Sequence, residues 1–261
     1  MLSARFRRSA SVSRAGVRRL TSFALVATLG LLTLTGCRSD PSVAVYAGGQ
    51  KLTEAKLDQM MDELLAKVPA EQRQPDLVAG LRGELVRFFA LTAAAKSYAA
   101  TTGQTLPAGP VTEIGARFRL PETAEVVQAA AQGVAAVTMF DQAAEKANPQ
   151  AVPTEDDRRD AYAQLRGPQG EPTGLSYAEA RPLLTDEALA KPVTQRELIE
   201  GASADVGVSI NPRYDRSYPV QLVLDGQKVT AVDVHFGPAG AVVQAPPPAP
   251  AGAPGGGHDD H

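Results

Sequence analysis

The sequence predicts a mainly α-helical fold, with a short β-hairpin at the start of the folded body and a small β element near its end. Aromatic residues make up only 5% of the 261-residue chain and Trp is absent, which favours a core of Ala, Leu and Val on helices. Apolar residues recur at helical spacing over several long stretches that stop at Gly or Pro. Alternating apolar and polar residues occur only in short runs. With 44% hydrophobic residues, the chain can bury a substantial core.

Residues 1–36 have the features of an export signal. They contain six arginines and no acidic residue, and an apolar-to-neutral run extends from Thr21 to Thr35. This run is shorter than the about 20 residues that a membrane-spanning helix needs. It ends in Leu34-Thr35-Gly36-Cys37, which resembles the lipobox of bacterial lipoproteins. We therefore expect cleavage between Gly36 and Cys37, and a lipid on the Cys37 thiol.

The expected mature chain is acidic and has no disulfide. Cys37 is the only cysteine, so the folded body depends on its core alone. Removing residues 1–36 takes away six of the 26 basic residues and none of the 29 acidic ones, which leaves a formal net charge of −9. This charge argues against a nucleic-acid partner. The lipid would anchor the protein in the cell envelope, on the extracytoplasmic face of a bacterial membrane, with Sec or, given Arg18-Arg19, twin-arginine export.

The elements can be predicted in order after a tether over residues 37–42. A strand over 43–46, a Gly48-Gly49 turn and a return through 51–52 form a hairpin, and Thr53 caps a helix that ends before Pro69. Further helices are expected over 76–100, 112–118 and 122–147, from the capping residue Thr154 to Gly167, after Ser176, and over 194–204.

The carboxyl-terminal part is predicted to be β-rich and then unstructured. Residues 206–210 alternate like a strand, and the runs 220–224 and 229–234 flank Asp225-Gly226 as in a hairpin. We expect a helical domain over 43–214, a β-rich segment over 215–243 and a disordered Pro/Gly-rich tail over 244–261.

Four stretches, in this order, resemble the SurA and PrsA class of extracytoplasmic chaperones. They are "VAVYAGGQKLTEAKLDQMMDELL", "VPTEDDRRDAYAQL", "LSYAEARPLL" and "DVGVSINPRYD". In that class a parvulin prolyl-isomerase domain lies between the second and third stretches, whereas this chain has only "RGPQGEPTG" there. Gly48-Gly49 also replaces the Asn-Gly usual in the first turn, and the segment after Tyr214 is an addition to the pattern.

The resemblance implies a SurA-N-like helical module without the isomerase. It would act as an ATP-independent holdase that binds unfolded or partly folded secreted proteins. The alternative is an adaptor or structural lipoprotein that uses the 220–236 hairpin to bind one folded envelope partner. A broad apolar groove on the helices would favour the holdase, and a filled core with an exposed β edge would favour the adaptor. An isomerase would need a catalytic domain for which the chain has no room.

Large flexible or aromatic side chains on the predicted helices are the candidates for client binding, since thioethers adapt to varied surfaces. The alternative interpretation is that they are ordinary core residues of amphipathic helices. The candidates are Met60, Met61, Phe88, Phe89, Met139 and Phe140.

Catalytic, metal and cofactor sites are not predicted. His235 is the only histidine outside the tail, and a surface or packing role suits it better than a catalytic one. His258, Asp259, Asp260 and His261 lie on a Gly-rich tail that could not orient them around a metal ion. No phosphate-binding loop or zinc-ligand spacing is present in the sequence.

Overall fold

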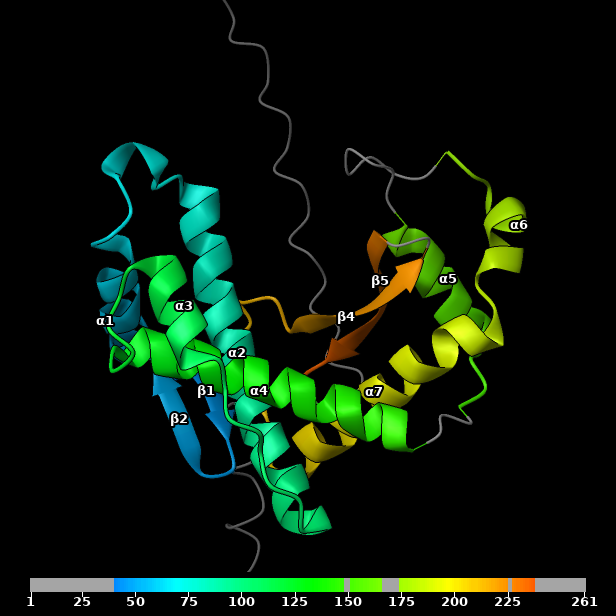
Figure 1. Cartoon of the computed structure of the whole chain (residues 1–261), viewed down its shortest axis with the longest axis horizontal. Coiled ribbons are helices and arrows are strands. Elements are labelled where there is room, and N and C mark those ends of the chain that lie inside the picture. Colours follow the sequence, from blue (N-terminus) through cyan, green and yellow to red (C-terminus); the bar gives the residue numbers. More distant parts are fainter. Residues whose placement is uncertain (1–39, 148–150, 166–173, 225–226, 238–261) are drawn as a thin grey trace, which may run out of the picture. The chain divides into compact units, whose positions relative to one another are not determined.

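The computed structural model describes residues 40–147, 151–165, 174–224 and 227–237. This part of the chain is mainly helical, as predicted (Figure 1). The helices and strands are β1 (Val43–Ala47), β2 (Gln50–Thr53), α1 (Glu54–Leu65), α2 (Pro75–Thr102), α3 (Val111–Phe118), α4 (Glu125–Lys146), α5 (Glu155–Gln164), α6 (Tyr177–Ala180), α7 (Asp186–Asp205), β3 (Ser209–Ile210), β4 (Ser217–Leu224) and β5 (Gln227–His235). Short 3₁₀ turns occupy Ala70–Gln72 and Arg181–Leu183.

The first hairpin turns through the two predicted glycines. Gly48 and Gly49 have φ values of 56° and 80°, so a two-residue loop with both φ angles positive joins the paired residues Ala47 and Gln50. β1 is the central strand of the order β2-β1-β3. The strand predicted over 206–210 is shorter than expected, because only Ser209–Ile210 pairs with β1.

Local capping signals set most helix boundaries where they were predicted. The Thr53 hydroxyl accepts a hydrogen bond from the Lys56 N–H at 3.2 Å and starts α1. Gly103, with φ of 68°, ends α2 in the left-handed conformation. Thr154 forms a capping box with Asp157 at the start of α5.

The long helices make the core. α1 buries Leu57, Met60, Met61 and Leu64, and α2 packs against both α4 and α7, which also contact each other. α2 is buried over only part of its length, since Leu85 is 6% exposed whereas Leu77, near the start of the helix, is 46% exposed.

α7 is longer than the predicted helix over 194–204. It begins after Thr185, whose hydroxyl accepts a hydrogen bond from the Ala188 N–H at 3.1 Å, and it contains Pro192. A proline inside a helix removes one hydrogen bond and costs about 3 kcal/mol. Burial of Leu189 and Val193 on either side of the proline offsets this cost.

The second hairpin shares the helical core. β4 and β5 pair antiparallel, and β5 packs against α5 and α7 (Figure 1). One hydrophobic cluster contains Leu57 of α1, Leu91 of α2 and Val232 of β5. The boundary expected between residues 214 and 215 is therefore not a boundary between two cores. The Asp225-Gly226 turn lies outside the described residues.

A polar cluster joins Arg213 and Tyr214, which follow β3, to Glu54 at the start of α1. The Arg82 and Tyr214 side chains reach the same Glu54 carboxylate oxygen, at 2.8 and 2.7 Å, and Arg213 pairs with the other oxygen at 3.0 Å. Burial alone would lower the pKa of Arg82, but hydrogen bonds to Glu54, Tyr214 and Asp58 outweigh it and raise that pKa. These contacts connect residues 213–214 to α1 and α2.

Candidate functional site

The six predicted client-binding residues do not form an exposed apolar surface. Met60, Met61 and Met139 are 3 to 4% exposed and Phe140 is fully buried. These four side chains belong to the core, as the alternative interpretation of the sequence had it, so they cannot contact a client in this conformation. The sequence-based prediction that these four residues form an apolar surface for clients is therefore corrected: they are core residues.

Phe88 and Phe89 are only partly buried. Phe88 packs onto Gly133 of α4 so closely that a Cβ at that glycine would lie 2.2 Å from its Cγ. Phe89 and Met60 line a small cavity of about 80 Å³ between β2, α1, α2 and α4. The cavity has room for one small side chain at most, so it is not a binding site for a polypeptide.

A larger groove of about 470 Å³ runs along β4. Helices α2, α4 and α7 contribute its other walls, and five consecutive strand residues form its floor. Its lining consists of Glu84, Val137, Asp141, Gln195, Tyr218, Pro219, Val220, Gln221 and Leu222. A groove of this volume is within the range of protein ligand sites.

Two side chains with hydrogen-bonding groups line the groove, Gln195 and Tyr218. Gln195 is only 6% exposed, and among the described residues its side-chain amide makes no hydrogen bond. The same holds for the hydroxyl of Tyr218, within the part of the chain that the structure describes. Burial, with a further contribution from the Glu84 carboxylate, raises the pKa of Tyr218 to about 12, so its hydroxyl stays protonated and can donate. Neither group is among the buried unpaired side-chain atoms of the described residues, so both are open to water or to a ligand that enters the groove.

The rim of the groove carries more carboxylates than cations. Arg87 lies 2.5 Å from Glu84 and 3.9 Å from Asp215. Lys191 is likewise shared, at 2.9 Å from Asp141 and 3.8 Å from Glu145. None of the described residues that line the groove is Lys or Arg. Within these two ion-pair clusters, four carboxylates share two cations, and Glu84 and Asp141 line the groove itself.

The edge of β4 that faces away from β5 is poorly suited to adding another strand. Among the described strands, β4 pairs with β5 alone. Pro219 is the third of the eight residues of β4, opposite Asp233, and has no N–H to donate to a neighbouring strand. A peptide in the groove would have to be bound mainly through side chains.

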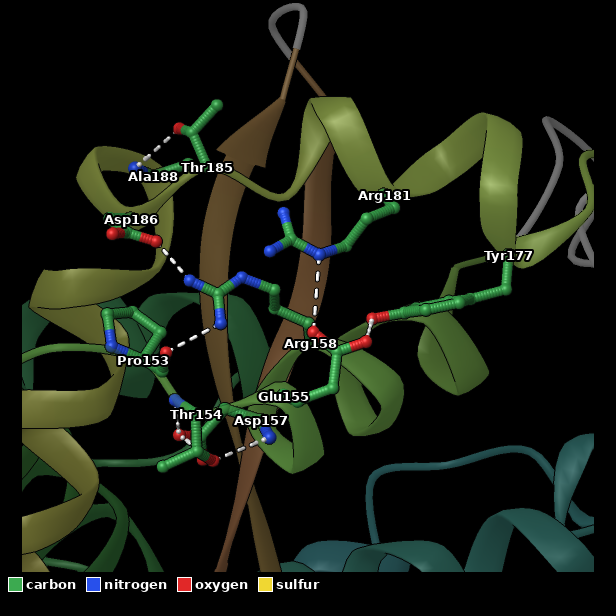
Figure 2. Close-up of polar contacts among 10 residues, drawn as sticks. All are labelled: Pro153, Thr154, Glu155, Asp157, Arg158, Tyr177, Arg181, Thr185, Asp186 and Ala188. Carbon is green, nitrogen blue, oxygen red and sulfur yellow. Dashed lines mark hydrogen bonds and ion pairs between the residues drawn. The ribbon is translucent and has the colours of Figure 1, made fainter.

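α5 and α7 are joined by a polar junction, part of which is drawn in Figure 2. Arg158 is 6% exposed, donates to the Pro153 carbonyl at 2.6 Å and pairs with the Asp186 carboxylate. Asp157 is 4% exposed and accepts hydrogen bonds from Thr154 at 2.7 Å and from Arg196 at 2.6 Å. Burial alone would raise the pKa of Asp157, but these hydrogen bonds lower it below its usual value.

α6 is tied to α5 by a second set of contacts. The Tyr177 hydroxyl donates to Glu155 at 2.6 Å, and Arg181 donates to the same carboxylate at 3.3 Å (Figure 2). The hydrogen bond from Tyr177 lowers the pKa of Glu155. The Tyr162 ring meets the Tyr177 ring edge-on, with centroids 5.3 Å apart. The two ends of the loop thus meet directly, although residues 166–173 lie outside the described residues.

The other predicted functional positions are either peripheral or outside the described residues. His235 is exposed at the end of β5, where its backbone N–H donates to Glu200 at 3.2 Å. Within the described ranges, no three His, Cys, Asp or Glu side chains are grouped so as to hold a metal ion. Cys37 and the His258–His261 tail lie outside these ranges. None of the described helices has the length and apolarity to cross a bilayer.

Sequence reasoning did not find the groove. Its residues come from α2, α4, α7 and β4, which are far apart along the chain. The one local feature that could have drawn attention to this strand is Tyr218-Pro219, an aromatic residue and a proline at the start of a β-rich run. Comparisons with models of protein families, with curated proteins and with solved structures found no match for this chain.

Proposed function

We propose that this chain is a non-enzymatic lipoprotein that binds unfolded or partly folded exported proteins as an ATP-independent holdase. It would be anchored through a lipid on Cys37, on the extracytoplasmic face of a bacterial membrane. The observation that supports binding is the groove of about 470 Å³ along β4, which is lined by the hydrogen-bonding side chains of Gln195 and Tyr218. A chaperone of this kind lowers aggregation by binding the unfolded state, without nucleotide.

Two observations support a role without prolyl isomerisation. Only nine residues, Arg166 to Gly174, separate the two helices between which the resembling foldases carry their catalytic domain. The contacts of Tyr177 and Arg181 with Glu155 join these helices directly. Turnover of a proline-containing peptide by the protein would contradict this part of the proposal.

A second candidate function is that of an adaptor for one envelope partner. The burial of Met60, Met61, Met139 and Phe140 favours it, because a filled core leaves no broad apolar surface for diverse clients. The two functions differ in selectivity: a holdase binds many unfolded chains, whereas an adaptor recognises a single folded surface.

Light scattering of an aggregating protein tests the holdase directly. The full chain, purified in mild detergent, is added at increasing ratio to a chemically unfolded model protein without nucleotide. We expect suppression near equimolar amounts, and loss of suppression in a folded Gln195→Leu variant. Leu183→Ser is the matched control, because Leu183 is 54% exposed and does not line the groove. No suppression, together with capture of a single envelope protein, would favour the adaptor.

A further inference from the structure

The occupant of the β4 groove can be defined more closely from its dimensions. Five consecutive residues, Tyr218 to Leu222, form its floor. At about 3.4 Å per strand residue, this floor is about 15 Å long, which suits an extended segment of about five residues. A folded domain would not enter such a groove, whereas one strand of unfolded chain would.

The polar groups define which parts of the segment can be bound. Gln195 can donate from its amide nitrogen and accept at its amide oxygen, which are the two functions that match a peptide group. The Tyr218 hydroxyl provides another donor. Because Pro219 interrupts the backbone donors of β4, these side chains replace a ladder of strand hydrogen bonds.

The charges define the chemistry of the segment's side chains. Arg87 and Lys191 are each shared by two carboxylates, so four acidic groups meet two cations at the rim. Glu84 and Asp141 belong to this set and line the groove themselves, beside the apolar side chains of Val137 and Val220. A cationic side chain with aliphatic neighbours complements this surface, and an acidic one would be repelled.

We infer that the β4 groove binds extended polypeptide segments in which a Lys or Arg is flanked by aliphatic residues. This inference rests on the proposed function and specifies its client class. Segments of this composition are found in unfolded chains, where the aliphatic residues are not yet buried. The groove would then select among exposed segments by charge.

Three fluorescently labelled peptides that differ at one central position test the inference by anisotropy with the full chain. The peptides have Val and Leu on both sides of a central Lys, Ala or Glu. We expect the Lys peptide to bind roughly five- to tenfold more tightly than the Ala peptide, and the Glu peptide to bind least. The preference should shrink when salt is raised from about 0.05 M to 0.5 M, since exposed charges are then screened.

Two double variants assign the preference to the groove. Glu84→Gln with Asp141→Asn should abolish the preference for Lys while leaving the affinity for the Ala peptide nearly unchanged. Glu187→Gln with Asp205→Asn removes the same charge from exposed positions that do not line the groove, and should leave the preference intact. Equal loss in both variants would mean that net charge alone is responsible, and would overturn the inference.

The outcomes separate this inference from the proposed function. Suppression of aggregation with equal binding of the Lys, Ala and Glu peptides would overturn the charge selection and leave the holdase standing. Failure both to suppress aggregation and to bind any of the peptides would overturn the proposed function itself. A preference for Lys that persists in the Glu84→Gln, Asp141→Asn variant would place binding elsewhere and overturn the site.

Discussion

The α5–α7 junction and the β4 groove both contain paired charged side chains, but they use them differently. In the junction, Arg158 pairs with Asp186, and Arg196 pairs with Asp157. In the groove, Arg87 and Lys191 are each shared by two carboxylates. The charges of the junction are therefore paired one to one, although Arg158 Nε is buried without a hydrogen-bond partner among the described residues, whereas beside the groove four carboxylates share two cations.

This difference separates a structural polar cluster from a candidate binding site. Polar groups that satisfy one another stabilise the folded chain and have little left for a ligand. The Gln195 amide and the Tyr218 hydroxyl line the groove and can form hydrogen bonds to a ligand that enters it. Substitutions in the junction should therefore change stability, and substitutions in the groove should change binding.

The largest expected effect on stability comes from Asp157→Ala. The substitution removes the acceptor for both Thr154 and Arg196, and we expect a loss of about 2 kcal/mol in the free energy of unfolding, because Arg196 is still partly hydrated. Urea denaturation followed by circular dichroism measures it. The matched control is Asp156→Ala, an exposed neighbour, for which a change within about 0.5 kcal/mol is expected. Equal losses in both variants would remove the special role of the junction.

The Asp157 carboxylate should also affect how the free energy of unfolding depends on pH. Because the folded-state pKa of Asp157 is lowered, its contribution is present above the unfolded pKa of about 4 and is lost as the pH falls through the folded value. Unfolding free energy should therefore decrease below about pH 4, and less steeply in Asp157→Asn. Asp233 contributes with the opposite sign, since burial raises its pKa. Identical acid profiles for the two proteins would contradict this assignment.

A smaller effect is expected from Thr154→Ala. The variant loses the hydroxyl that accepts from the Asp157 N–H at 3.1 Å, and we expect a loss of about 1 kcal/mol. Thr154→Ser keeps the cap and serves as the control, with little change in the urea midpoint. If Ser and Ala variants lose the same stability, packing of the Thr154 methyl group is responsible instead of the cap.

The smallest effect on stability is expected in the groove. Glu84→Gln with Asp141→Asn breaks two partly exposed ion pairs, and we expect a change of less than about 1 kcal/mol in unfolding free energy. The same variant should lose its discrimination between Lys and Ala peptides. A loss of stability as large as that of Asp157→Ala would show that the rim is structural, and the contrast between the two regions would fail.

The sequence by itself determined the elements whose signals are local. Gly48-Gly49 specified the first turn, Thr53 and Thr154 specified helix starts, and Gly103 specified a helix end, because each depends on hydrogen bonds or φ angles within a few residues. Helical periodicity also determined the mainly helical class.

Tertiary structure decided what depends on contacts between distant residues. It placed Met60 and Phe140 in the core, extended α7 through Pro192, and assembled the groove from α2, α4, α7 and β4. Periodicity identifies an apolar face but does not show what covers it. Burial depends on packing, and so do the ion pairs that Arg87 and Lys191 each form with two carboxylates. Packing brings together residues that are far apart in the sequence, so their spacing along the chain does not predict these contacts.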